Sequence, residues 1–250
     1  MENDKLAMRN YRYSPLTRYG QLLTRKINRA INEFSLLSDD DRVCVAVSGG
    51  KDSLSLLHLL MEHKRFYNGH YPVEAVHAVS DYNPQAGETK AYLMKLFESL
   101  GIEYGFVEIS VTTGRNGKKS DPTCFWCSWK RREALFKYCV EKGCNKLAFA
   151  HHSDDVAETT LLNLVYHGSL ETMLPGRDFF DGAFTLIRPL FYVREKELAR
   201  YAKMAGFTTV SCICPNADRG KRKVMKKLLQ DLRKESRQLN ANLWRAAKRW

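Results

Sequence analysis

Residues 43–53, VCVAVSGGKDS, decide the fold that this chain is expected to have. A short apolar run leads directly into two adjacent glycines, Gly49 and Gly50, and then into a helical pattern. Adjacent glycines let the backbone approach an anion closely, and the first N–H groups of the following helix point at it with the positive end of the helix dipole. The order of strand, glycine turn and helix therefore predicts a phosphate-binding loop.

Two familiar phosphate-binding motifs do not fit this turn. A Walker A loop, G-x-x-x-x-G-K-[ST], would need glycine in place of Val45 and a hydroxyl side chain in place of Asp52. No G-x-G-x-x-G occurs in the chain either, so the turn does not encode a dinucleotide fingerprint. The plain alternative is a glycine-rich turn without a ligand, but the hexapeptide SGGKDS behind an apolar strand favours a binding loop.

Composition bounds the class of protein. A chain of 250 residues that is 44% hydrophobic can bury one main core. No run of ~18 apolar residues occurs and the N-terminal stretch lacks the apolar segment of a signal peptide, so we expect a soluble, cytoplasmic protein without a membrane partner. In a reducing compartment the seven cysteines are better interpreted as thiols or metal ligands than as a disulfide framework.

Helical and strand patterns alternate along the chain. After the strand that begins at residue 43, further strands are expected at 73–79, 104–109, 147–150, 186–187 and 208–211, with helices at 19–34, 88–100, 126–142, 155–166 and 195–205. This alternation predicts an α/β fold with a parallel sheet and helices on both faces, whose ligands bind at the carboxyl ends of the strands. The predicted units are an N-terminal helical segment (1–38), the main domain (39–218) and a basic C-terminal helical tail (219–250).

The formal net charge of +12 indicates a polyanionic partner besides a nucleotide, and nucleic acid is favoured over a membrane. After Asp218 the only acidic residues are Asp231 and Glu235, in a predicted helix whose other charges are all basic. The basic residues are Arg219, Lys221, Arg222, Lys223, Lys226, Lys227, Arg233, Lys234 and Arg237. We expect this stripe to contact phosphates; the alternatives are a solvated helix face and, for the whole chain, a merely basic surface.

The apolar side of the basic helix is predicted from residues spaced mainly by four. These residues are Val224, Leu228, Leu232 and Leu239. Further along, Trp244 and Trp250 could stack on exposed bases.

Two cysteine pairs suggest a metal site. Cys124 and Cys127 form a C-x-x-C at a predicted helix start, where the helix dipole favours thiolates, and Cys212-Ile-Cys214 follows far downstream. Three interpretations compete: a four-thiolate zinc site, a thioredoxin-like redox pair and an iron–sulfur cluster. A redox pair would follow the first strand of a βαβ unit without a phosphate loop, which does not fit. Zinc is compatible, although C-x-C is shorter than the usual zinc-ribbon spacing.

The combination of motifs resembles a known family. SGGKDS looks like the PP-loop of the ATP pyrophosphatases, and a PP-loop followed by C-x-x-C about seventy residues later and by a distal cysteine resembles the tRNA-thiolating group that contains the 2-thiocytidine synthetase TtcA. The likeness runs over residues 19–232. Further shared features are AHHSDD at residues 150–155, Glu158, Asn163, Arg188-Pro189-Leu190, Arg194-Glu195-Lys196 and Arg222.

The resemblance implies an ATP site at the loop. The residues that would hold the pyrophosphate end of ATP are Ser48, Gly49, Gly50, Lys51, Asp52 and Ser53. Asp52 would also help to place Mg²⁺, Asp155 would lie near the phosphates or Mg²⁺, and His152 would orient its own segment. His151 could be a core, capping or ligand-binding residue, and Asp154 could be the N-cap of the following helix.

The resemblance also implies a [4Fe-4S] cluster held by three cysteines, which leaves one iron free to carry sulfur. The predicted ligands are Cys124, Cys127 and Cys214; the spacing from Cys214 to Arg222 favours Cys214 over Cys212. With Asp52, these three cysteines are the predicted catalytic residues. The other cysteines, Cys44, Cys139 and Cys144, are expected to be structural thiols.

The implied function is ATP- and cluster-dependent thiolation of tRNA, with 2-thiocytidine formed at position 32 of the anticodon loop. ATP would adenylate O2 of the base, and a cluster-bound sulfur would then attack C2. One alternative is a 2-thiouridine synthetase, although the chain lacks the extra C-x-x-C pairs of the 2-thiouridine-54 synthetases. A lysidine-type ligase would have no use for the three cysteines. The alternative from another class is a non-catalytic RNA-binding protein with structural zinc. Besides tRNA, the expected partners are a sulfur donor system of unspecified identity and a second copy in a homodimer.

Overall fold

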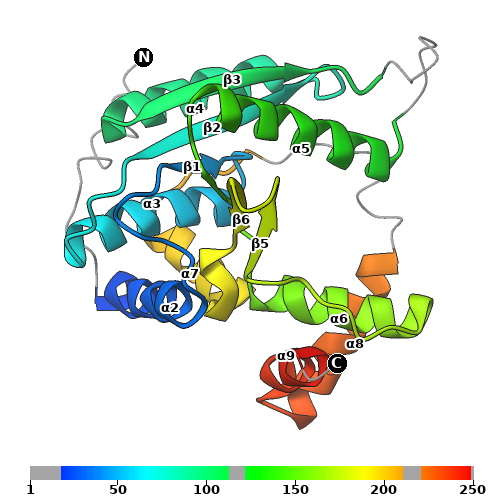
Figure 1. Cartoon of the computed structure of the whole chain (residues 1–250). Coiled ribbons are helices and arrows are strands. Elements are labelled where there is room, and N and C mark those ends of the chain that lie inside the picture. Colours follow the sequence, from blue (N-terminus) through cyan, green and yellow to red (C-terminus); the bar gives the residue numbers. More distant parts are fainter. Residues whose placement is uncertain (1–17, 113–121, 211–220, 249–250) are drawn as a thin grey trace.

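The computed structural model describes residues 18–112, 122–210 and 221–248, and these residues are arranged around a six-stranded sheet (Figure 1). The strand order is β3-β2-β1-β4-β6-β5. The strands are β1 (Val43–Ala46), β2 (Val73–Ser80), β3 (Glu103–Ile109), β4 (Lys146–Ala148), β5 (Gly176–Phe179) and β6 (Phe184–Ile187). All neighbouring pairs are parallel except β5 and β6, which are antiparallel. The predicted α/β fold with a parallel sheet is confirmed.

Helices cover both faces of this sheet (Figure 1). The described helices are α2 (Arg18–Phe34), α3 (Lys51–Phe66), α4 (Ala86–Leu100), α5 (Cys124–Glu141), α6 (Ser153–His167), the short 3₁₀-helix η1 (Pro189–Tyr192), α7 (Glu195–Met204), α8 (Lys221–Glu235) and α9 (Leu239–Lys248). Of these, α8 and α9 pack on α6 and not on the sheet (Figure 1). None of the described helices is long and apolar enough to span a bilayer.

Alternation along β1 sends neighbouring side chains into different cores. Val43 and Val45 lie in the larger core, with buried residues of α2, α3 and α4. Cys44, between them, lies in a second core with Leu135 and Cys139 of α5. Because successive strand residues point to opposite faces, a strand buried on both sides is apolar throughout. This explains why the run before the glycine pair is continuous. The expected boundaries at residues 38 and 218 stay a prediction.

Two strand predictions need correction. Residues 208–210 do not form a strand. The Val210 N–H donates a hydrogen bond to the carbonyl oxygen of Gly49, at 3.0 Å. The edge strand β5 was not predicted, because its sequence GRDF is charged and largely exposed and so carries no apolar alternation.

The predicted apolar side of the basic helix is also wrong. Val224, Leu228 and Leu232 are 57%, 42% and 39% exposed, whereas the neighbouring stripe of Met225 and Leu229 is buried at 3% and 0%. The buried stripe packs on α6, whose acidic side chains attract the cations beside it. Leu239 lies in the next helix, α9.

Candidate active site

The phosphate loop, residues 48–53, follows β1 at the carboxyl edge of the sheet. The Ser48 N–H donates to Ser53 Oγ at 3.1 Å, and Ser53 Oγ donates to the Gly50 carbonyl oxygen at 2.9 Å. Gly49 has a φ of +87°, and a Cβ there would lie 3.4 Å from Thr89 Cγ2. The positive φ favours glycine at this position, whereas the 3.4 Å distance is an ordinary van der Waals contact. Gly50 starts α3 without a side-chain cap among the described residues, so the first helical N–H groups are available to an anion.

Lys51 and Asp52 form the charged end of this loop. Lys51 Nζ lies 2.8 Å from Asp52 Oδ2 and 3.4 Å from Glu195 Oε1. Burial disfavours the ammonium charge, yet these two carboxylates together raise the pKa of Lys51 above its ordinary value. Asp52 Oδ1 is buried and has no hydrogen-bond partner in the described part of the chain. An unpartnered carboxylate oxygen next to an anion-binding turn fits the oxygen ligand that Mg²⁺ requires.

The segment at residues 150–155 leaves β4 at the same edge and starts α6. His152, not Asp154, is the N-cap: the Asp155 N–H donates to His152 Nδ1 at 3.4 Å, and the His152 N–H donates to Asp155 Oδ2 at 2.9 Å. This reciprocal pair fixes the start of the helix. The geometry is compatible with the predicted orienting role of His152, while its contact with a nucleotide stays a prediction. His151 Nδ1 is buried and unpartnered among the described residues.

Asp154 is a buried anchor that the sequence did not reveal. It is 3% exposed and accepts hydrogen bonds from the Glu195 N–H at 2.5 Å and from Asn240 Nδ2 at 2.9 Å. Arg233 Nη2 lies 2.5 Å from its Oδ1. Burial opposes ionisation, but these three partners lower the pKa of Asp154 below its ordinary value. One carboxylate therefore joins α6 to α7, α8 and α9.

We expect Asp154→Ala to lower the free energy of unfolding by about 3 to 5 kcal/mol, because the largely buried Arg233 cation and the Glu195 N–H would lose their partner. Urea denaturation with a common slope measures this change. Asp231→Ala removes an exposed carboxylate paired with Lys234 and should leave the midpoint unchanged. Equal midpoints for the two variants would contradict the anchoring role.

Glu195 connects the phosphate loop to α8. Its carboxylate lies between Lys51 Nζ and Lys226 Nζ, the latter 2.8 Å from Oε2. Although it is partly buried, Lys226 and Lys51 lower the pKa of Glu195. Lys226 was predicted to be part of the phosphate-binding stripe, but it faces Glu195. Arg233, predicted for the same stripe, is likewise paired with Asp154 and largely buried. The other described residues of the stripe are still candidates.

Cys124 and Cys127 lie at the start of α5, as expected for the C-x-x-C, and the helix begins two residues before residue 126, where its start was expected. Cys124 is exposed and Cys127 half-buried. Thr123 caps the helix by accepting the Trp126 N–H at 3.1 Å, and Arg131 Nη2 lies 3.9 Å from Cys127 Sγ. Because α5 connects two parallel strands, its N-terminus lies at the carboxyl edge of the sheet, on the same side of the molecule as α6 (Figure 1).

The remaining predicted residues divide into three groups. Cys44, Cys139 and Cys144 are buried, as expected for structural thiols. Cys212, Cys214, Arg219 and Trp250 lie outside the described residues. Trp244 is half-buried and packs against Phe34 and Phe191 in T-shaped arrangements, so its stacking on a base stays a prediction.

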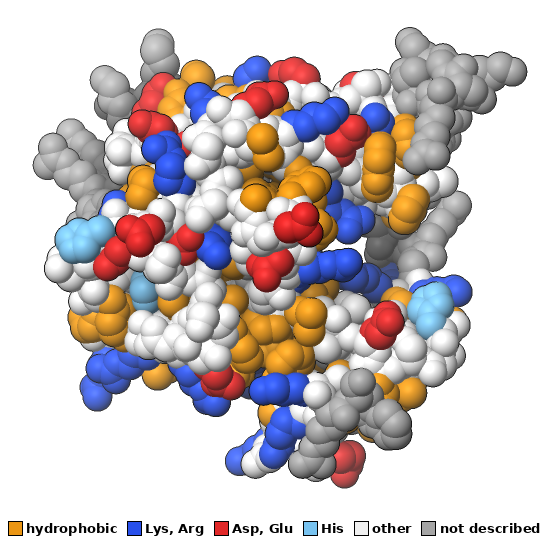
Figure 2. Space-filling model, in the orientation of Figure 1, with side chains coloured by type: hydrophobic (Ala, Val, Ile, Leu, Met, Phe, Trp, Pro, Cys, Tyr) orange, Lys and Arg blue, Asp and Glu red, His pale blue; other side chains and the backbone are white. Residues whose placement is uncertain are grey.

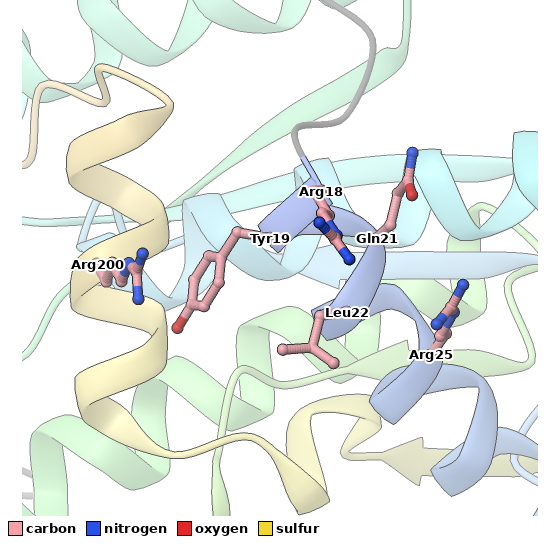
Figure 3. Close-up of a pocket in the computed structure, with 6 residues that line it drawn as sticks. All are labelled: Arg18, Tyr19, Gln21, Leu22, Arg25 and Arg200. Carbon is pink, nitrogen blue, oxygen red and sulfur yellow. The ribbon is translucent and has the colours of Figure 1, made fainter.

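A separate pocket lies between α2 and α7 (Figure 3). Its lining consists of Arg18, Tyr19, Gln21, Leu22, Arg25 and Arg200. The Arg200 guanidinium lies 4.4 Å from the centre of the Tyr19 ring. None of these lining residues is a carboxylate, a thiol or a histidine, so the pocket provides no ligand set for a metal and is not the active site.

Comparison with known proteins identifies the family of this chain. A PP-loop domain matches residues 21–230. The chain is 36% identical over 235 residues to the tRNA-cytidine(32) 2-sulfurtransferase of Hahella chejuensis, covering 92% of this chain and 81% of that relative. It is 37% identical to the tRNA-cytidine(32) 2-sulfurtransferase of Geobacter sulfurreducens, with 88% and 86% covered.

Solved structures share the fold. The U34-tRNA thiolase NcsA from Methanococcus maripaludis, described with its [4Fe-4S] cluster, matches with a TM-score of 0.77 and 23% identity over 92% of this chain and 78% of that one. The NMN synthetase from Francisella tularensis matches with a TM-score of 0.52 and 14% identity over 85% of each chain. On the strength of the domain match and the sequence relatives, the chain belongs to the PP-loop family and, within it, to the family of the tRNA-cytidine(32) 2-sulfurtransferases.

Proposed function

We propose that this protein uses ATP to activate cytidine 32 of tRNA and replaces its O2 with sulfur. The family relatives are named for this reaction. The observation that carries the proposal is the buried Asp52 oxygen beside Lys51, which has no partner among the described residues. It lies at the start of α3, where no side chain of the described residues caps the helix. The C-x-x-C at the start of α5 lies at the same carboxyl edge of the sheet. A tRNA substrate and the use of free thiols favour the cytoplasm as the place of reaction.

In the first step, O2 of the base attacks the α-phosphorus of ATP, the new O–P bond forms, and pyrophosphate leaves. The N–H groups of the phosphate loop and Lys51 would hold the departing pyrophosphate, since they form the cationic face of the site. Asp52 and Asp155 would hold Mg²⁺, whose charge would offset that of the phosphate oxygens.

In the second step, sulfur bonds to C2 of the base, the C2–O bond breaks, and AMP leaves. Cys124, Cys127 and Cys214 would hold a [4Fe-4S] cluster, which would supply the sulfur. The accessible thiols at the start of α5 suit this role. A sulfur donor system is a further partner, because the sulfur is consumed at each turnover.

The test combines two measurements on anaerobically purified protein with unmodified tRNA. We expect tRNA-dependent release of pyrophosphate and 2-thiocytidine in the digested tRNA. Formation of 2-thiouridine would favour the uridine alternative. Tight RNA binding with zinc present and no pyrophosphate release would favour a non-catalytic RNA-binding protein.

The exposed residues Lys223 and Lys227 of α8 test the proposed docking face. Replacing both with Gln should weaken the binding of any tRNA and reduce the slope of log affinity against log salt by about 0.7 to 0.9 for each phosphate that the variant no longer neutralises. Binding assays over a salt series measure this slope. The control variant replaces Lys95 of α4 and Lys137 of α5, which removes the same charge elsewhere. An unchanged slope in the α8 variant would mean that this face points to water.

A further inference from the structure

Four arginines from separate parts of the fold gather near His151, just after β4: three are close enough to affect its pKa, and the fourth lies beside Arg188. Burial and then Arg188, Arg222 and Arg132 lower the pKa of His151 to about 3. Arg177 of β5 is near enough to Arg188 to affect its pKa as well. Figure 2 shows Lys and Arg side chains gathered in a hollow, and Figure 1 shows that this hollow lies between α5 and α6.

Carboxylates compensate the charge of this group of arginines only in part: Asp155 attracts Arg188 and Glu158 attracts Arg222, without forming an ion pair. Within the described part of the chain, none of the four forms an ion pair with an acidic side chain, although other arginines such as Arg233 do. Arg132 Nε donates to the Ser128 carbonyl oxygen at 3.3 Å, and Arg188 donates to the Leu174 carbonyl oxygen. Arg188 Nε is buried and has no partner among the described residues. Burial, and then repulsion from Arg177 and Arg132, lower the pKa of Arg188 to about 10. An anion bound here would relieve that repulsion.

The sheet sets the distance between this group and the phosphate loop. The loop follows β1, Arg188 follows β6 two strands away, and Arg177 lies on β5 three strands away. At ~4.8 Å between neighbouring strands, these offsets are about 10 and 14 Å. Arg188 and Arg177 therefore leave the sheet beside the phosphate loop and not within it, so they offer donors for an anion in addition to the N–H groups of the loop.

We propose that Arg132, Arg177 and Arg188 bind a backbone phosphate of the tRNA beside the nucleotide that is modified. The inference rests on the proposed function. A base in a tRNA loop reaches a recessed site only when its nucleotide is turned out, and this exposes the flanking phosphates. Guanidinium groups suit such a phosphate, because their planar fork donates two parallel hydrogen bonds to its oxygens.

The test replaces the two exposed arginines, Arg132 and Arg177, because replacing the partly buried Arg188 could disturb the fold. Arg132→Gln with Arg177→Gln should weaken the binding of a fluorescein-labelled anticodon stem-loop by at least about tenfold, and should reduce the salt slope by about 0.7 for the one single-strand phosphate contact that is lost. ATP affinity should not change. Arg188→Lys, which keeps the charge and loses the fork, should weaken binding less than the double variant.

The matched control replaces Arg18 and Arg25, two exposed arginines of the α2 pocket, with Gln. We expect the stem-loop to bind this control with wild-type affinity. Wild-type affinity and slope in the Arg132/Arg177 variant would overturn the inference while leaving the proposed function intact, and so would an equal loss in both variants. Wild-type protein that binds no stem-loop and releases no pyrophosphate with tRNA would overturn the inference and the proposed function together.

Discussion

Replacing Asp52 with Ala is expected to lower the rate of tRNA-dependent pyrophosphate release by about 10²- to 10³-fold, with little change in tRNA affinity. The reason is local: one oxygen of this carboxylate contacts Lys51 and the other is buried without a partner among the described residues, so the side chain can place a cation against the phosphates of ATP. Rapid-quench measurement of pyrophosphate, together with a tRNA-binding curve, separates the two effects.

Asp52→Asn is the matched variant, because it keeps the shape and removes the charge. If the carboxylate acts through its charge, Asn should be nearly as impaired as Ala. Full pyrophosphate release in the Asn variant would limit Asp52 to a hydrogen-bonding role, and full release in both variants would remove it from the reaction. Unchanged urea midpoints would show that the loss is not one of folding.

The order of β1, phosphate loop and α3 could be predicted from sequence because all its determinants lie within eleven consecutive residues. The helix ends were predictable for a similar reason: Gly101, with a φ of +63°, closes α4 within a single turn. Local signals of this kind do not depend on how distant elements pack.

The charged network around the loop could not be predicted in the same way. Asp154 meets Glu195 across 41 residues of sequence and Asn240 across 86. No spacing rule relates such partners, and Asp154 on its own matched the pattern of an N-cap. Local spacing could not identify the buried side of α8 either, because two apolar stripes, Val224/Leu228/Leu232 and Met225/Leu229, both have helical spacing. The buried stripe is the one that brings Arg233 and Lys226 to carboxylates of α6 and α7.

The cysteines can be tested independently of the ATP site. Replacing Cys124 and Cys127 with Ser should reduce the iron content from about four per chain to well below one, because only a single cysteine of the predicted set would remain. Thiolation should be lost, whereas pyrophosphate release should largely persist, since the phosphate loop, Lys51 and Asp52 make no contact with the start of α5 that the structure records in its described part. Iron and sulfide analysis of anaerobically purified protein, paired with nucleoside analysis of tRNA, measures both outcomes.

Cys139→Ala is the control, because Cys139 lies on the same helix but is fully buried in the core. It should keep iron, sulfide and thiolation, with any cost confined to stability, since a small apolar side chain replaces a buried thiol. Colourless wild-type protein that binds one zinc after anaerobic reconstitution would rule out the cluster. Loss of pyrophosphate release in the Cys124/Cys127 variant would show instead that the two halves of the reaction depend on each other, and that the start of α5 contributes to adenylation as well as to sulfur transfer.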